Sequence, residues 1–392
     1  MPDKSDELGA SRVPLLAAAG FCGNMSWQLV LPVLPLHLAR IGYAPAEIGA
    51  LISVLSLVMG TVELEAGPIA TAVGRRAALL AGFSGNAICL VLTSVARSAG
   101  AVASALGAVG AARAVFVPQL QAAVAESGTP STRGRMFGMY WFGASVATLA
   151  GPALGGGVAA QHGDRAAFYL AAGFSVLALP MVATVAGRRG ALPRSSLREV
   201  KVVLSHGAVL RLCGACLLCF AITGLWSTFL PLHMARQGIS VSVVGWVFTV
   251  QGSVYTLLQA AIGRMIGHRR ADWLAPAGIV GMSAAAFVVP FLRTPAEFLA
   301  LGACYGASFG VIPVTFATRV TGFLVRDHFT TAMGVYNSAI DYGLFLGPLL
   351  GGALALVGPA APFALALPLG LAALLLSVNA ADAKRWVGNT EA

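Results

Sequence analysis

The strongest constraint on the fold of this chain is that its sequence repeats. Residues 34–42 read LPLHLARIG and residues 230–238 read LPLHMARQG, seven identities in nine at an offset of 196, which is half of the 392-residue length. The same offset aligns GPALGG at 151–156 with GPLLGG at 347–352. The chain is therefore a tandem duplication. A duplicated, very apolar chain is typical of secondary transporters built from two parallel repeats.

The amino-acid composition indicates that the repeats fold in a lipid bilayer and not in water. Hydrophobic residues make up 57% of the sequence and charged residues 10%, with a mean hydropathy of +0.81, which leaves too little polar surface to cover a soluble globule. Because ~20 apolar residues cross ~30 Å of hydrocarbon, the apolar runs predict an all-α integral membrane protein with twelve transmembrane helices in two pseudo-symmetric six-helix bundles. The predicted spans are 13–38, 47–70, 77–96, 100–123, 136–160, 167–186, 208–233, 243–266, 273–292, 296–318, 332–356 and 361–378.

The net charge of +10 raises the question of nucleic-acid binding, and the distribution of the charge answers it. With an inside N-terminus, the basic residues concentrate in the inner loops; the five in outer loops are Arg40, Arg97, Arg165, Arg236 and Arg293. This bias is the positive-inside rule, so no nucleic-acid partner is expected. The polar segment 187–207 reads as a cytoplasmic linker between an N-terminal bundle, 1–186, and a C-terminal bundle, 208–392. Both termini are expected in the cytoplasm of a bacterial cell, with the protein in its inner (plasma) membrane.

The six cysteines all fall inside predicted spans, where they are expected to pack as apolar groups. Three of them, Cys213, Cys216 and Cys219, are spaced along one helix flank without a nearby histidine. Thiolates in hydrocarbon are costly without a metal, so apolar packing accounts for these thiols better than a metal site does. We expect no metal or other cofactor.

A loop motif and a helix motif carry a family resemblance. After the second span comes GPIATAVGRR, from Gly67 through Gly74 to Arg75 and Arg76, which resembles a loop signature of the major facilitator superfamily. Thr71 stands where that signature has an aspartate, so the charge pairing of the loop that the resemblance implies is not reproduced here. The resemblance extends over essentially the whole chain. It implies the twelve-helix fold of that superfamily and alternating access to a central site.

The fifth and eleventh spans resemble the glycine ladder of drug/proton antiporters. Glycines spaced four apart let another backbone approach closely, and proline bends the helix. Ordinary membrane packing would also account for these glycines, so the pattern favours antiport only moderately. The residues that define the two ladders are Gly151, Pro152 and Gly155 in the fifth span, and Gly347, Pro348 and Gly351 in the eleventh.

Charged residues inside the spans are the best candidates for coupling. Arg113 in the fourth span matches an arginine that the superfamily often carries there, and Asp341 in the eleventh is the deepest carboxylate. An intramembrane charge is by default a functional-site hypothesis, and low polarity disfavours the ionised form of a carboxyl group. We expect Asp341 to carry the proton, Glu63 to be second, and Arg113 to bias protonation or to pair with substrate. Asn337 shares a helix face with Asp341.

The resemblance implies that the first, fourth, seventh and tenth spans line a central site. Aromatic rings beside a few hydrogen-bonding groups suit an amphipathic organic molecule better than a sugar, although packing or interface anchoring is an alternative for each residue. The candidates for substrate binding are Asn24, Trp27, Gln28, Arg113, Gln119, Tyr140, Trp141, Thr223, Trp226, Gln251, Tyr255, Tyr336 and Asn337. By contrast, the repeated histidines His37 and His233 stand near outer helix ends, where we expect them to be simply hydrated, with a role in pH coupling as the alternative.

Together these observations predict a monomeric secondary transporter, not an enzyme, that exports a small amphipathic molecule in exchange for protons. The alternative is a proton symporter or facilitator that imports a small metabolite such as an organic acid, with Arg113 as its carboxylate clamp. A phosphate-binding loop of ATP-driven pumps is absent from the sequence. A channel and a transport-inactive receptor stay open as further alternatives.

Overall fold

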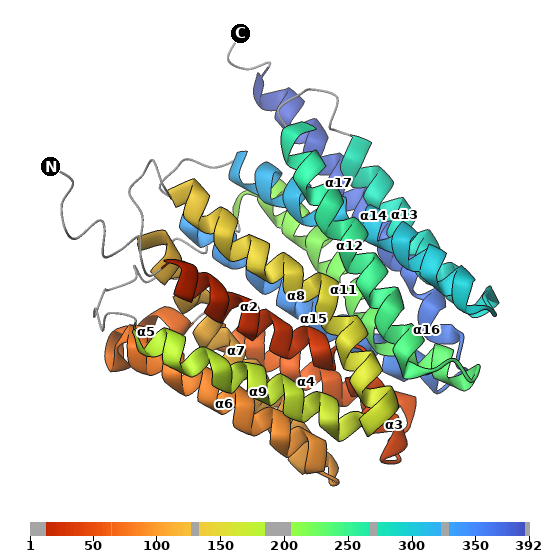
Figure 1. Ribbon diagram of the computed structural model, residues 1–392. Coiled ribbons are helices and arrows are strands. Elements are labelled where there is room, and N and C mark those ends of the chain that lie inside the picture. The colour runs from red at the N-terminus through yellow and green to blue at the C-terminus, as the bar shows by residue number, and fades with distance from the viewer. Residues whose placement is uncertain are drawn as a thin grey trace, which may run out of the picture. The chain divides into compact units, whose positions relative to one another are not determined.

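The computed structural model describes residues 13–63, 65–126, 133–184, 205–265, 273–322 and 329–388 (Figure 1). Within these ranges every regular element is a helix. Eleven of the helices are long and apolar enough to cross a membrane, and α2 (Val13–Val30) adds an 18-residue apolar helix at the start of the chain. The prediction of an all-α integral membrane protein is confirmed. Most of the predicted linker, 187–204, lies outside the described residues.

The helices follow the predicted spans closely in both repeats. In the first repeat they are α2, α3 (Leu34–Arg40), α4 (Pro45–Glu63), α5 (Ala66–Val73), α6 (Arg75–Val95), α7 (Ala99–Glu126), α8 (Arg133–His162) and α9 (Asp164–Ala183). In the second they are α11 (Gly207–Arg236), α12 (Val241–Met265), α13 (Leu274–Val288), η2 (Val289–Phe291), α14 (Pro295–Gly322), α15 (Phe329–Ala355), α16 (Ala361–Ala364) and α17 (Ala366–Gly388).

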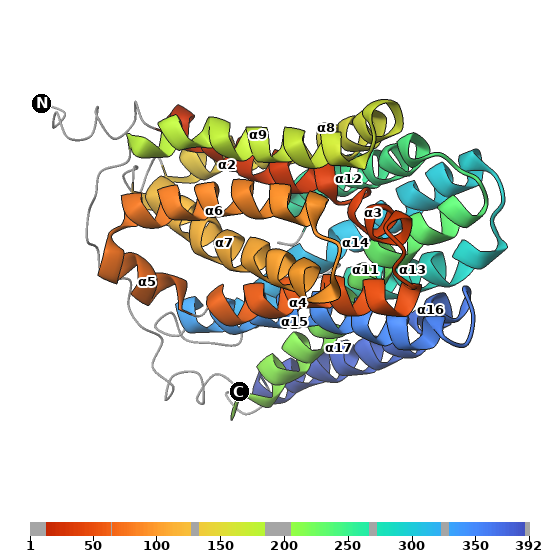
Figure 2. The same ribbon diagram turned by 90° about the horizontal axis from the view of Figure 1, so that it is seen from below.

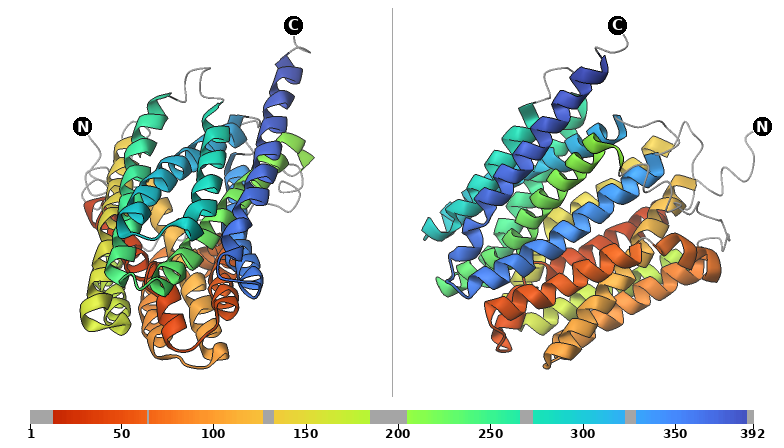
Figure 3. Two further views of the ribbon diagram at one scale, coloured as in Figure 1. Left: turned by 90° about the vertical axis from the view of Figure 1, so that its right-hand side faces the viewer. Right: turned by 180° about the vertical axis from the view of Figure 1, so that it is seen from behind.

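Contacts divide the described residues into two compact units. The first takes those within 1–42, 54–194 and 240–249, and the second takes those within 43–53, 195–239 and 250–392. In the first unit α2 packs on α8 and α9, and α6 packs on α7 and α9 (Figure 2). In the second, α11 packs on α15 and α17, and α13 packs on α14 (Figure 3). The initial turns of α4 thus group with the second unit and those of α12 with the first.

The first span is not one helix, which corrects the prediction of a single span over 13–38. α2 ends at Val30, a turn covers residues 31–33, and α3 begins at Leu34. In the second repeat, α11 continues unbroken for 30 residues. Both repeats carry the later proline, Pro35 or Pro231, but Pro32 is matched by Thr228 at the offset of 196. Two prolines three residues apart remove two backbone donors within one turn, and the helix breaks there.

The second predicted span also divides, because α4 ends at Glu63 and α5 begins at Ala66. α5 carries most of the loop motif, and α6 begins at Arg75 directly after Gly74. Gly74 has φ +89°, in the region that favours glycine. The motif therefore marks a sharp backbone turn between two helices, and Arg75 is buried just beyond it.

Glycines of the ladder lie where two helix backbones approach closely. In the first unit a methyl group on Gly155 would overlap the carbonyl oxygen of Leu29 on α2. In the second unit a methyl group on Gly347 would overlap the carbonyl oxygen of Ala221 on α11. Because glycine alone fits at such a distance, α8 and α15 pack against α2 and α11 with their backbones nearly in contact.

Candidate proton and substrate sites

A polar and aromatic cluster occupies the interior of the second unit. The indole Nε1 of Trp226 donates to Oε1 of Gln251 at 2.9 Å, and the indole stacks on the ring of Tyr305 with centroids 4.1 Å apart and planes 14° apart. Tyr305 in turn donates its phenol proton to Oγ1 of Thr223 at 3.0 Å. Trp226 and Tyr305 are both fully buried. α11, α12 and α14 therefore hold one fixed aromatic pair whose polar atoms are satisfied.

Phe309 extends this cluster toward less buried rings. It stacks on Tyr255 with centroids 5.4 Å apart, meets Phe220 edge-on at 5.3 Å and lies 6.1 Å from Tyr305. Phe309 and Tyr255 are only partly buried. The rigid pair of Trp226 and Tyr305 thus supports an outer layer of partly exposed aromatic surface, the kind of wall that holds flat or lipophilic ligands.

α15 brings the candidate proton carrier to the same unit. Asp341 is 5% exposed, and it lies within a helix segment that is apolar enough to cross a membrane. Two residues further along, Gly343 lies where an added methyl group would overlap the carbonyl oxygen of Leu217 on α11. Tyr336, on the same helix, is buried and donates its phenol proton to the carbonyl oxygen of Pro313 at 3.1 Å. Asn337 is exposed.

In the first unit Arg113 is held between aromatic rings. Its guanidinium carbon lies 5.1 Å from the ring centroid of Trp27 and 5.9 Å from that of Phe116, and Nη1 donates to the carbonyl oxygen of Gly23 at 3.4 Å. Arg113 is 9% exposed. Cation–π contacts strengthen when the cation is desolvated, so α2 and α7 together stabilise a buried positive charge.

The other polar candidates of the first unit hydrogen-bond to neighbouring groups of the protein. Gln28 donates to Oγ1 of Thr148 at 3.0 Å, and Gln119 donates to the carbonyl oxygen of Ala66 at 3.1 Å while its own Oε1 is buried without a partner. Asn24 donates to the carbonyl oxygen of Gly20, within its own helix.

The remaining candidates range from buried to half-exposed positions. Tyr140 is buried and is a hydrogen-bond partner of Gln121. Trp141 meets the Tyr140 ring edge-on but is itself 54% exposed. Glu63, at the end of α4, is partly buried.

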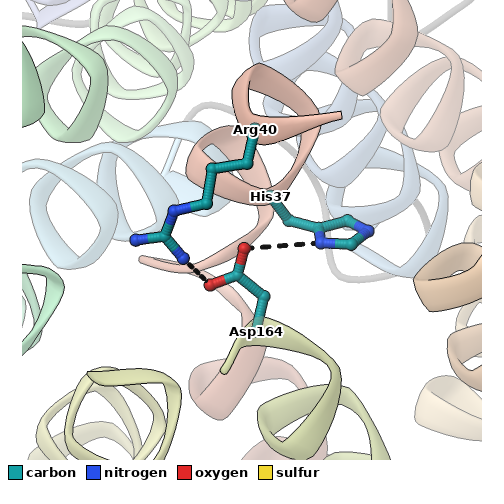
Figure 4. A network of polar contacts seen from close by, with 3 residues as sticks. All are labelled: His37, Arg40 and Asp164. Atoms are coloured by element: carbon teal, nitrogen blue, oxygen red, sulfur yellow. Dashed lines mark hydrogen bonds and ion pairs between the residues drawn. The ribbon is translucent and has the colours of Figure 1, made fainter. Parts of the chain in front are cut away.

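The outer helix ends correct the expectation for one histidine. His37 is 4% exposed, and its Nδ1 lies 3.5 Å from a carboxylate oxygen of Asp164, which also pairs with Arg40 (Figure 4). Asp164 begins α9, where a negative charge is favoured by the helix dipole, and the ring of Phe168 covers the imidazole. The expectation of simple hydration is therefore wrong for His37. His233, its counterpart, is partly buried and bonds to Gln237.

Four important residues were not found from the sequence: Phe116, Tyr305, Phe309 and Asp164. Aromatic residues in apolar spans give no sign of which ring faces which. For Asp164 a signal existed, because an acidic residue is favoured at the start of a helix by the helix dipole. For metals, a search of the residues that the structure describes finds no group of three potential ligands.

Buried charges within a duplicated set of apolar helices define a multi-pass membrane protein with polar groups in its interior. The chain matches the sequence profile of the Major Facilitator Superfamily over residues 16–240 and 211–389. It therefore belongs to this superfamily and is not an enzyme.

Individual relatives agree with this assignment. The multidrug resistance protein MdtG of Citrobacter koseri is 24% identical over 351 residues, covering 85% of this chain and 86% of MdtG. Among solved structures, the nucleoside transporter NupG aligns with a TM-score of 0.75 at 12% identity, covering 97% of this chain and 99% of NupG. The human organic anion transporter MFSD10 (TETRAN) aligns with a TM-score of 0.65 at 20% identity, covering 94% and 99%. These two likenesses concern the fold.

Proposed function

We propose that this protein exports a small amphipathic organic molecule in exchange for protons, by alternating access. The observation that carries the proposal is the burial of the Asp341 carboxyl group within a membrane-crossing helix of the second unit. The similarity to a multidrug resistance protein supports export of a drug-like molecule. The protein would act as a monomer in the bacterial inner membrane with both termini in the cytoplasm.

Asp341 has the properties that a proton carrier needs. A carboxyl group inside a membrane-crossing helix can take up a proton from one side of the membrane and release it to the other as its access alternates. α15 also carries Tyr336, about 7.5 Å along the helix axis from Asp341 at 1.5 Å per residue. A proton bound at Asp341 would therefore change the charge inside the second unit, on the helix that also carries Tyr336.

The aromatic layer suggests the class of substrate. Phe309 and Tyr255 stack on each other and are only partly buried, and the side chains that hydrogen-bond to Trp226 and Tyr305 are the neutral ones of Gln251 and Thr223. A ligand held there would be lipophilic, with one or two polar groups, because few directed hydrogen bonds are on offer.

Arg113 favours a second candidate, which is import of an organic acid coupled to protons. Its guanidinium is buried but held by rings and a backbone carbonyl, so a bidentate contact with a substrate carboxylate would add strong charge-assisted hydrogen bonds. In that case Arg113 would determine affinity for the anion, and substrate and proton would move in the same direction.

The test is Asp341→Asn in proteoliposomes that carry an internal pH dye and an imposed pH gradient. We expect the variant to fold and to bind lipophilic cations but to lose transport driven by the gradient. The matched control is Glu47→Gln, which changes an exposed helix-capping carboxylate to an amide. Transport by Asp341→Asn at the wild-type rate would refute its role as proton carrier. Proton movement in the same direction as a transported organic acid would select the second candidate.

A further inference from the structure

Two hydroxyl groups occupy equivalent positions in the repeats and reach the helix turns that contain Pro152 and Pro348. A proline within a helix is expected to bend it, and these two turns are called the proline bends. Ser53 on α4 and Thr249 on α12 are related by the offset of 196 residues, as are Pro152 on α8 and Pro348 on α15. Within the first unit, the backbone N–H of Ala153 donates to Oγ1 of Thr249 at 3.0 Å. Within the second, Oγ of Ser53 donates to the carbonyl oxygen of Phe345 at 2.9 Å.

The two contacts involve opposite ends of backbone hydrogen bonds that are equivalent in the two repeats. In a regular helix the N–H of Ala153 would donate to the carbonyl of Leu149, and Leu149 is the repeat counterpart of Phe345. A proline ring pushes away the preceding turn and weakens the bonds around it. At the bend of α8 a hydroxyl accepts from the backbone donor, whereas at the bend of α15 a hydroxyl donates to the backbone acceptor.

A glycine one helical turn before each hydroxyl allows its helix to approach the proline-containing helix closely. Four residues before Ser53, Gly49 lies where a methyl group would overlap the carbonyl oxygen of Pro348. Four residues before Thr249, Gly245 has the same relation to the carbonyl of Pro152. Oγ of Ser53 also lies 2.7 Å from the carbonyl oxygen of Gly49, so its single proton is shared between the carbonyls of Gly49 and Phe345 in a three-centre hydrogen bond. Each helix therefore presents a backbone contact and, one turn later, a hydroxyl to a bent partner.

We propose that Thr249 and Ser53 are paired positioning residues that complete the hydrogen bonding of the bent helices α8 and α15 in one conformation of the transport cycle. This inference rests on the alternating-access function proposed above. When α12 separates from α8, and α4 from α15, each bend loses its hydroxyl partner. The two contacts therefore stabilise the packed conformation by the free energy of the hydrogen bond that each hydroxyl makes. Neither hydroxyl needs to contact the substrate or the proton for this effect.

Amide hydrogen exchange of the full-length protein in lipid nanodiscs tests the local contact directly. We expect Thr249→Val, which keeps the shape but removes the acceptor, to speed exchange in peptides covering 149–156 by about five- to thirty-fold, the factor that one or two lost kcal/mol gives. Thr249→Ser should behave as wild type. Ser53→Ala should speed exchange in peptides covering 345–352, and Ser53→Thr should not. The control is Thr61→Val, because the Thr61 hydroxyl donates within its own helix, to Leu57.

A double variant tests whether Thr249 replaces hydrogen bonding lost at the proline or only tightens the packing of α12 on α8. Pro152→Ala restores an N–H and lets α8 adopt regular bonding, so adding Thr249→Val should then change exchange less than about twofold. A full effect of Thr249→Val in the Pro152→Ala background, or no effect in wild type, would overturn the proposal. In proteoliposomes Thr249→Val should change the maximal transport rate more than KM. If exchange changes as expected but the protein transports none of the tested molecules, the role of the two hydroxyls is supported and the proposed transport function is contradicted.

Discussion

A buried polar triad in the first unit allows a quantitative prediction of helix-packing energy. Nδ2 of Asn86 on α6 donates to Oγ of Ser26 at 2.9 Å and to Oγ of Ser175 at 2.8 Å, and Ser175 donates to Ser26 at 3.0 Å. The three side chains, from α6, α2 and α9, are at most 1% exposed. The triad therefore joins three membrane helices by hydrogen bonds in a place that water does not reach.

The cost of removing the triad should depend on which part is removed. Asn86→Leu, close to isosteric, deletes two hydrogen bonds but leaves the serines bonded to each other, so we expect a loss of about 1–3 kcal/mol in the free energy of unfolding, at about 0.5–1.5 each. The double variant Ser26→Ala, Ser175→Ala leaves two buried amide protons of Asn86 without acceptors and should cost more, about 2–6 kcal/mol. The triple variant removes every polar member and should recover to within about 1 kcal/mol of wild type.

The assay is denaturant unfolding in mixed micelles, followed by the fluorescence of the six tryptophans. The deciding quantity is the coupling energy between Asn86→Leu and the two serine substitutions. We predict that adding Asn86→Leu to the double serine variant increases its stability. If the losses from Asn86→Leu and from the serine pair simply add, the triad is not a hydrogen-bonded unit and the reasoning fails. Thr93→Val serves as the control, since the Thr93 hydroxyl donates within its own helix, to Cys89.

Two further predictions concern helix approach and the outer ion pair. Gly155→Ala should sharply lower the yield of monodisperse protein in size-exclusion chromatography, since the added methyl would meet the carbonyl of Leu29, whereas Gly157→Ala, with open space around it, should match wild type; equal yields would contradict the close approach. Asp164→Asn should lower the thermal midpoint at neutral pH by removing the partner of His37 and Arg40, and an unchanged midpoint would mean that the pair contributes no stability.

The sequence predicted the helices because the apolar runs are local and long. Spans such as 77–96 and 100–123 agree with α6 and α7 to within a few residues. The break after Val30 was missed, although Pro32 and Pro35 mark it, because a composition window averages over single prolines. The proposed roles of Asp341 and Arg113 stay predictions, but their burial within apolar helices agrees with the reason they were selected.

The sequence by itself determined that this chain is a duplicated, multi-pass helical protein of the major facilitator type, because hydropathy, repeat spacing and glycine motifs are written along the chain. Only the tertiary structure decided which side chains meet. Tyr305 and Thr223 lie 82 positions apart, Ala153 and Thr249 lie 96 apart, and Arg40 and Asp164 lie 124 apart. Such pairs depend on the rotation and crossing of packed helices, which glycine contacts and proline bends fix in space and which no local pattern encodes.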